Sequence, residues 1–219
     1  MNDRKLDALL APAEFEMLPK LDLTRTSCVV FDVLRATSTM TVALANGAEV
    51  IMPCATIEEA VAASKADPNL LLAGERGGQR ITAAVSGSLD FDLGNSPREM
   101  TADIVSGKRL ATTTTNGTRA LQACRGAERV WLGSFLNLSA LGQTIRKANP
   151  QRLLLVCAGT REAAALEDAL GAGALCDLLW PALGQAASDS ARLVCDRYRN
   201  CQTQLLQSAS EAKNARHLL

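Results

Sequence analysis

The sequence predicts an α/β protein, a three-layer α/β/α sandwich in which helices cover both faces of a mixed or mostly parallel sheet. Short, nearly continuous apolar runs recur along the chain, as expected for strands that are buried on both faces. Segments with helical periodicity separate these runs, which is the alternation typical of α/β folds. Hydrophobic residues make up 47% of the 219 residues, enough to fill a substantial core.

Four apolar runs are predicted as strands, because each is short and bounded by turn or polar residues. They are Cys28–Phe31, Glu49–Met52, Leu70–Ala73 and Leu153–Cys157. Four other segments are predicted as helices, namely Thr56–Ala66, Asn137–Ala148, Ala163–Leu183 and Ser188–Gln207. Thr56, with Glu59 three residues later, forms a capping-box pattern, and Asn137 is suited to cap the second helix.

A faint internal repeat divides the chain. A strand, a Thr-rich loop and a helix lead to Gly47-Ala48-Glu49 and a new strand, and a similar series leads to Gly126-Ala127-Glu128 and the apolar run Val130–Leu132. The repeat is either an ancient duplication or the ordinary likeness of two βαβ units. We therefore expect one domain over 1–219, or two fused halves of about 20–105 and 106–219.

The bulk composition narrows the class of function. Lys+Arg and Asp+Glu each number 23, and this balance argues against a nucleic-acid partner. No run approaches the roughly 20 apolar residues that span a bilayer, and Met1–Pro12 holds no secretory apolar run. Seven cysteines form no C-x-x-C pair, which favours reduced, mostly buried thiols. We expect a cytoplasmic protein without a membrane partner.

The loop that follows the first predicted strand, Asp32–Thr39, concentrates chemistry-bearing residues. It holds an acid, an arginine and three hydroxyl side chains, at the sheet edge where open α/β folds bind ligands. These groups suit a metal ligand, an anion clamp and phosphate hydrogen bonds. The alternative is an ordinary solvated turn between a strand and a helix.

Three further segments suit an anion. Gly74–Gly78 places adjacent Glu and Arg side chains between glycines, and the alternative is an exposed hairpin. Gly94–Pro97 begins a helix near its proline and leaves free N–H groups. Thr112–Arg119 combines hydroxyls, Asn-Gly and Arg, which suits a phosphate nest, although four threonines are also typical of an edge strand.

Two adjacent carboxylates, Glu167 and Asp168, complete the candidate site. If Thr160 caps the helix that follows, both lie beyond its first turn, where the helix dipole no longer explains them. Small residues surround them, so they suit a hard cation, and the alternative is a solvated acidic face.

Several phosphatase classes are excluded by missing residues. Leu34 stands two residues after Asp32, so the two-aspartate pattern of haloacid-dehalogenase-type phosphatases is absent. No cysteine has an arginine six positions later, and no Walker loop occurs. His217 is the only histidine, which argues against histidine-based phosphatases and His-ligated zinc.

Together, Asp32–Thr37, Gly74–Arg76, Gly94–Pro97, Thr114–Arg119 and Glu167–Asp168 resemble the motifs of the 2-phosphosulfolactate phosphatase family. The resemblance implies Mg²⁺ and hydrolysis of 2-phospho-3-sulfolactate to sulfolactate and phosphate, on the route to coenzyme M. It implies catalytic roles for Asp32, Arg35, Glu75, Arg76, Asn116 and Arg119, substrate contacts for Thr37, Ser38, Asn95, Ser96, Thr114, Thr115, Gly117 and Thr118, and metal ligation by Asp32, Glu167 and Asp168.

The expected partner is therefore a small anionic phosphorylated metabolite, and a homodimer stays open. Arg161-Glu162, and the polar run from Ser86 to Phe91, depart from the family pattern and bear on substrate choice. Two other readings remain, a magnesium-dependent phosphatase of another small phosphohydroxy acid and a non-catalytic module that binds anionic metabolites. Direct attack by water and a phosphoenzyme at Asp32 also both remain.

Overall fold

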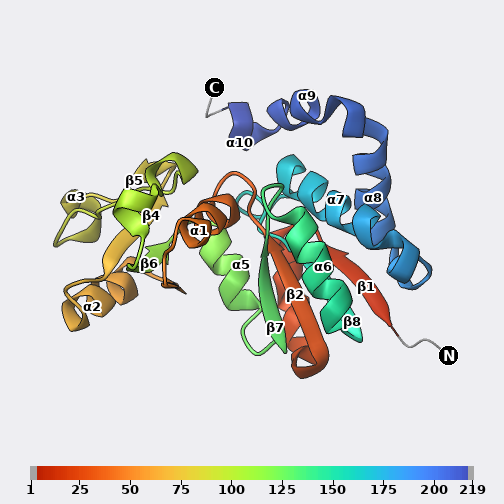
Figure 1. Ribbon diagram of the computed structural model, residues 1–219, viewed down its shortest axis with the longest axis horizontal. Coiled ribbons are helices and arrows are strands. Elements are labelled where there is room, and N and C mark those ends of the chain that lie inside the picture. The colour runs from red at the N-terminus through yellow and green to blue at the C-terminus, as the bar shows by residue number, and fades with distance from the viewer. Residues whose placement is uncertain (1–3, 217–219) are drawn as a thin grey trace.

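The computed structural model describes residues 4–216 and contains two four-stranded sheets with helices on their faces (Figure 1). Sheet A has the order β1-β8-β2-β7, and all its pairings are parallel. Sheet B has the order β3-β6-β4-β5, in which β5 runs antiparallel to β4. The predicted α/β class is confirmed, with the mostly parallel strands divided between two sheets.

The strands of sheet A are β1 (Lys5–Leu9), β2 (Thr26–Phe31), β7 (Arg129–Gly133) and β8 (Arg152–Cys157). Those of sheet B are β3 (Val50–Pro53), β4 (Leu71–Arg76), β5 (Gln79–Arg80) and β6 (Arg109–Thr113). The α-helices are α1 (Ala36–Ala45), α2 (Ile57–Ala66), α3 (Ala83–Ser86), α4 (Ala102–Val105), α5 (Gly117–Ala123), α6 (Leu138–Ala148), α7 (Leu166–Leu183), α8 (Asp189–Cys201), α9 (Leu205–Ser210) and α10 (Lys213–Arg216). Short 3₁₀ segments include η1 (Pro12–Lys20) and η3 (Pro97–Glu99).

In each sheet, a strand from one half of the chain lies between two strands from the other half. The first half of the chain runs β2, α1, β3, α2, β4, and its β2 lies between β7 and β8 in sheet A. The second half runs β6, α5, β7, α6, β8, and its β6 lies between β3 and β4 in sheet B. Gly47 and Gly126, which precede β3 and β7, share left-handed φ angles of 91° and 94°. The two halves thus share their order of strands and helices and the conformation of these glycines.

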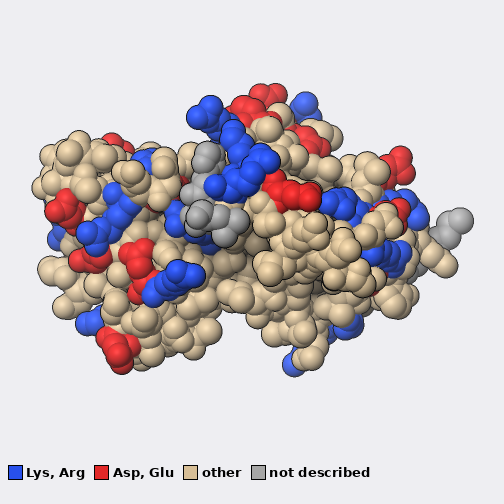
Figure 2. Space-filling view, turned by 90° about the horizontal axis from the view of Figure 1, so that it is seen from above, with Lys and Arg blue, Asp and Glu red and all other residues tan. Residues whose placement is uncertain are grey.

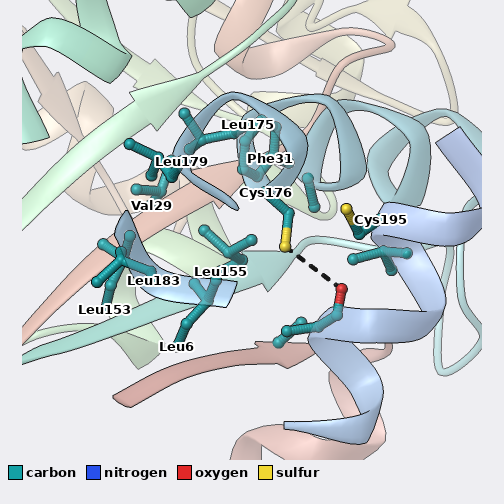
Figure 3. Close-up of a cluster of buried hydrophobic side chains, with 14 of the residues drawn as sticks. Leu6, Val29, Phe31, Leu153, Leu155, Leu175, Cys176, Leu179, Leu183 and Cys195 are labelled. Atoms are coloured by element: carbon teal, nitrogen blue, oxygen red, sulfur yellow. Dashed lines mark hydrogen bonds between the residues drawn. The ribbon is translucent and has the colours of Figure 1, made fainter. Parts of the chain in front are cut away.

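Hydrophobic side chains fill both faces of sheet A. On one face the strands pack against α6, α7 and α8, and Figure 3 shows Leu155 and Phe31 beside Leu175 of α7. The other face packs against η1 and α5. In the first of these layers the Cys176 thiol donates to the Ala191 carbonyl at 3.4 Å. All seven cysteines are buried and free, as the sequence predicted.

The predicted strands are confirmed within two or three residues of their ends, and so are the helices that became α2 and α6. The helix predicted from Ala163 begins instead at Leu166, because the turn from Thr160 to Ala163 closes on itself through two backbone hydrogen bonds. The predicted helix Ser188–Gln207 ends at Cys201 and resumes only as α9. Within residues 4–216 no helix is both long and apolar enough to cross a membrane.

Candidate functional site

A cavity of about 530 Å³ opens where loops from the carboxyl ends of both sheets meet α10. This is the edge at which parallel sheets bind ligands. The lining residues come from the β2–α1, β6–α5 and β8–α7 loops, the β4–β5 hairpin, the segment before η3 and α10. They are Asp32, Leu34, Arg35, Glu75, Gly77, Gly78, Gln79, Asn95, Thr115, Asn116, Thr160, Arg161, Lys213 and Asn214.

Asp32 is the most perturbed carboxylate that lines the cavity. Its Oδ1 accepts a hydrogen bond from the Ala36 N–H at 3.1 Å, which places the carboxylate at the start of α1. The side chain is 8% exposed, and burial, followed by the charges of Glu75 and Glu167, raises its pKa to about 6. A carboxyl that titrates near neutrality is suited to proton transfer.

The β2–α1 and β6–α5 loops are built in the same way. In the first, the Thr37 hydroxyl accepts from the Asp32 N–H at 3.1 Å and donates to the Asp32 carbonyl at 2.8 Å. In the second, the Thr118 hydroxyl accepts from the Thr114 N–H at 3.1 Å and donates to its carbonyl at 2.7 Å. These hydrogen bonds close each loop before its helix begins.

The two loops approach so closely that only glycine fits between them. A Cβ at Gly117 would lie 2.6 Å from Asp32 Oδ2 and 2.5 Å from the Ala36 side chain. Gly117 therefore allows the β6–α5 loop to reach the reactive edge of the β2–α1 loop. This contact joins the two halves of the chain at the site.

Glu75 holds three segments of the cavity wall together. One carboxylate oxygen accepts from the Thr115 N–H at 2.7 Å, and the other accepts from the Gly78 N–H at 2.7 Å. Gly77 and Gly78 form the turn of the β4–β5 hairpin with φ angles of 62° and 84°, a conformation that glycine adopts without strain. Both oxygens of Glu75 thus bind backbone groups.

Asp168 performs the equivalent task below the cavity. Its carboxylate accepts from the Val33 N–H at 2.8 Å and from the Gly159 N–H at 3.0 Å, so it ties the β2–α1 loop to the β8–α7 loop. Burial, together with the charges of Asp32 and Glu167, raises its pKa well above the ordinary value. Because α7 begins at Leu166, Asp168 lies in the first turn, where the helix dipole offsets part of its charge.

Glu167 is the buried carboxylate with an incomplete set of partners. One oxygen accepts from the Asn214 amide at 2.6 Å, whereas the other has no hydrogen-bond partner among residues 4–216. Its charge raises the pKa of both Asp32 and Asp168, so these carboxylates interact. An unpartnered carboxylate oxygen in an acidic cluster is suited to a cation.

The carboxylates near the cavity can supply some ligands of a Mg²⁺ ion but not a complete set. Within the described part of the chain, no three His, Cys, Asp or Glu side chains form a ready-made metal cage. Mg²⁺ is commonly held by one or two carboxylates, with water and a substrate phosphate as the other ligands. Asp32 and Glu167 fit this pattern, whereas both oxygens of Asp168 already accept backbone N–H groups.

The structure brings together part of the residue set predicted from the sequence. Of the predicted residues, Asp32, Arg35, Glu75, Asn95, Thr115 and Asn116 line the cavity. The hydroxyls of Thr37, Ser38, Thr114 and Thr118 bind backbone groups of their own loops and do not line it. The geometry gives these four a structural task, because their hydrogen bonds hold the loops closed.

Six more predicted residues lie outside the cavity lining, namely Gly117, Glu167 and Asp168, whose contacts are given above, and Arg76, Ser96 and Arg119. Arg76 donates to the Glu75 carbonyl and to the Thr113 hydroxyl, and Ser96 caps η3. Arg119 pairs with Glu162 through contacts of 2.6 and 3.2 Å, and both side chains are about half exposed or more. The guanidinium also lies 5.8 Å from the Phe15 ring centroid. The pair fastens α5 to the loop before α7.

Eight lining residues are not among the site residues predicted from the sequence, namely Leu34, Gly77, Gly78, Gln79, Thr160, Arg161, Lys213 and Asn214. Thr160 and Arg161 follow β8, so their position after a strand end was the available signal. Arg161 has a left-handed φ of 57°, and its N–H donates to the Asn116 side chain at 3.3 Å. Lys213 and Asn214 carry no local motif and reach the cavity only through the path of the last helices. His217 lies outside the described residues.

Comparisons with known proteins agree with this geometry. The family model described as 2-phosphosulpholactate phosphatase matches residues 14–219. A relative from Caldanaerobacter subterraneus subsp. tengcongensis, named probable 2-phosphosulfolactate phosphatase, is 45% identical over 160 residues, which are 72% of this chain and 63% of that protein. A relative of the same name from Synechococcus sp. is 42% identical over 167 residues, or 75% of this chain and 65% of its own.

A third relative with this name, from Thermotoga petrophila, is 45% identical over 149 residues, which cover 68% of this chain and 60% of the relative. The chain thus spans somewhat under two thirds of the length of these proteins. The match of the family model nevertheless includes every loop that lines the cavity. The chain belongs to the 2-phosphosulpholactate phosphatase family.

Proposed function

We propose that this protein is a magnesium-dependent phosphatase that hydrolyses 2-phosphosulfolactate, or a closely related hydroxy-acid phosphate, to the hydroxy acid and inorganic phosphate. The observation that carries the proposal is the buried Asp32 carboxylate, with its pKa raised to about 6, in a cavity that three cationic side chains also line. In the reaction the bond between phosphorus and the ester oxygen breaks. The ester oxygen takes up a proton, and the phosphoryl group is transferred to water.

Asp32 is the reacting carboxylate in this proposal. Two carboxylates line the cavity, and both oxygens of Glu75 accept backbone N–H groups. Asp32 Oδ1 accepts from Ala36, while Oδ2 faces the narrow contact with Gly117. Asp32 acts either as the base that takes the proton of the attacking water or as the nucleophile that accepts the phosphoryl group.

The remaining polar groups bind the anion. Asn95 and Asn116 line the cavity together with Asp32, and their side-chain amides can donate to phosphoryl oxygens. Arg35 and Arg161 offer planar forks that match a carboxylate. Arg35 also donates to the Gly78 carbonyl at 3.0 Å, which draws its guanidinium to the β4–β5 hairpin.

Asp32 and Glu167 would hold the Mg²⁺ ion, with water and the substrate completing its coordination. When bound, the ion supplies charge neutralisation at the phosphoryl oxygens. It also lowers the cost of keeping Asp32, Glu167 and Asp168 charged together. The unpartnered oxygen of Glu167 is the feature that supports this assignment.

A phosphate-release assay with purified protein tests the proposal. 2-Phosphosulfolactate, 2-phospholactate and 2-phosphoglycolate are compared with Mg²⁺ and with a chelator. We expect the fastest release from 2-phosphosulfolactate, its loss in chelator and its recovery when Mg²⁺ is restored. Full activity in excess chelator would contradict the role of the metal. Fastest turnover of another compound would show that this compound is the better substrate. No release from any phosphate ester would leave a non-catalytic binding module.

Acid quenching during turnover separates the two roles of Asp32. A phosphorylated peptide that contains Asp32, detected by mass spectrometry, is expected only if the carboxylate is the nucleophile. Its absence at saturating substrate, with a linear onset of phosphate release, is expected for direct attack by water.

A further inference from the structure

The short helix α10 forms a wall of the cavity and is held there in a defined register. Ala212 and Ala215 are buried, with 2% and 7% of their surface exposed. Asn214 donates to the Thr160 hydroxyl at 2.8 Å and to the Glu167 carboxylate at 2.6 Å. These contacts fix Ala212 and Asn214, the two neighbours of Lys213, so that Lys213 lines the cavity.

Three cationic side chains line the cavity: Arg35, Arg161 and Lys213. Within residues 4–216, none of them forms an ion pair. Figure 2 shows Lys and Arg side chains gathered around the middle of the face seen from above, the side along which α9 and α10 run in Figure 1. A cavity with unpaired cations is prepared for an anionic ligand.

Lys213 differs from the two arginines in its origin and chemistry. Arg35 and Arg161 belong to loops that directly follow strands and that carry Asp32 or contact Asn116. Lys213 belongs to a separate helix, which joins the site through Asn214. An ammonium group is a compact charge with three donors, which suits a tetrahedral anion, whereas an arginine fork suits a planar carboxylate.

We propose that Lys213 binds the sulfonate of the substrate, and that it therefore selects substrates with a third anionic group. This inference rests on the proposed function. Lys213 contributes to substrate binding and not to bond breaking, since the residues that surround the phosphoryl group come from other loops. Its removal raises KM and leaves kcat nearly unchanged.

The experiment compares two substrates that differ only in the sulfonate. 2-Phosphosulfolactate and 2-phospholactate share the phosphate and the carboxylate. For Lys213→Met we expect KM for 2-phosphosulfolactate to rise about tenfold, the scale of one charge-assisted hydrogen bond, and KM for 2-phospholactate to change less than about twofold. Lys213→Arg, which keeps the charge, is expected to recover most of the loss.

Arg216→Met is the matched control, because Arg216 is an exposed cation on the same helix that does not line the cavity. We expect it to change neither KM. An equal rise of KM for both substrates, an equal effect of the control, or an unchanged KM in Lys213→Met would each overturn the assignment.

Direct binding separates this proposal from the proposed function. Titration calorimetry with sulfolactate, the product that carries the sulfonate, is expected to show weaker binding to Lys213→Met than to the wild type. Binding of inorganic phosphate is expected to be equal in the two proteins. A wild type that binds sulfolactate through Lys213 but releases no phosphate would refute the phosphatase activity alone. Equal sulfolactate binding by both proteins would refute the role of Lys213.

Discussion

The buried charge of Asp32 destabilises the folded protein, but the same burial gives the carboxyl a pKa that suits proton transfer. Its folded-state pKa of about 6 lies above the ordinary value of 3.8, so the folded protein binds the proton more tightly. The contribution of Asp32 to the free energy of unfolding therefore falls as pH rises from about 4 to about 6. Above that range the full destabilisation persists. A shift of this size corresponds to about 3 kcal/mol.

Asp32→Asn is expected to lower kcat at least about 100-fold and to raise Tm at pH 7.5 in chelator. The amide oxygen can still accept from the Ala36 N–H, while the buried charge is removed. Steady-state kinetics and thermal melts at pH 5 and pH 7.5 measure both effects. The rise in Tm should be largest at pH 7.5.

Asp90→Asn is the control, since Asp90 also accepts a backbone N–H, from Ala83 at 2.6 Å, but is exposed. It should change neither kcat nor the pH dependence of Tm. A destabilised Asp32→Asn variant would show that the carboxylate charge supports the fold, contrary to its raised pKa.

Arg119, which the sequence assigned to the site, and Arg161, which it did not, have different surroundings. Arg161 lines the cavity and makes no ion pair within the described residues, whereas Arg119 pairs with Glu162. We expect Arg161→Met to lower kcat/KM about 10-fold to 100-fold and Arg119→Met to lower it less than about threefold. Kinetics of the two variants, with unchanged melting curves, test this difference. A loss of kcat/KM that is larger for Arg119→Met than for Arg161→Met would show that Arg119 contributes to the site.

At the scale of elements, the position of the site depends on how closely α7 and α8 pack. Both helices cover sheet A, and the first turn of α7 carries Glu167 and Asp168. A Cβ at Gly173 would lie 2.1 Å from the Val194 carbonyl oxygen, so the helices meet there through their backbones. Glycine in a helix interior is disfavoured by about 1 kcal/mol relative to alanine, and this close approach accounts for it.

Gly173→Ala is therefore expected to destabilise the protein by about 1–3 kcal/mol despite its better helix propensity, because the backbone of α8 must move. Gly142→Ala on α6 gains the same propensity. Its Cβ would lie 2.4 Å from Cδ2 and 3.2 Å from Cγ of Leu178, a residue that is 37% exposed and whose side chain can move aside. Chemical denaturation of both variants is the measurement. Equal effects would contradict the backbone contact.

For the whole molecule, the exchange of central strands makes the two sheets interdependent. Sheet A needs β2 from the first half of the chain, and sheet B needs β6 from the second. Without the second half, sheet A would lose β7 and β8 and sheet B would lose β6. Without the first half, sheet A would lose β2 and β6 would remain alone in sheet B, so most ladder hydrogen bonds would be lost in either case. The site lies where both halves meet.

We expect the protein to unfold in one cooperative transition. Trp131 and Trp180 lie in β7 and α7, so their fluorescence reports on sheet A, whereas far-ultraviolet circular dichroism reports on both sheets. The two signals should give the same midpoint in a denaturant titration. Separate midpoints would indicate that sheet B unfolds independently.

Local sequence patterns determined the type of many elements and part of the cavity wall. Buried strands and the Thr56 cap of α2 depend on contacts within a few residues, so short patterns predicted them, and the Gly77-Gly78 hairpin was one of two alternatives for its segment. Asp32 and Asn116 follow strand ends and Glu75 lies near the end of β4, and the carboxyl edge of a parallel sheet brings such positions together. These predictions needed no knowledge of distant contacts.

The tertiary structure alone decided which polar groups face the cavity. Arg119 pairs with Glu162 from another loop, and Lys213 reaches the cavity from a helix far along the chain. A side chain's partner depends on elements remote in sequence, and local patterns carry no information about their distance. The division of the strands into two sheets was hidden for the same reason, because pairing of β2 with β7 and β8 is a long-range contact.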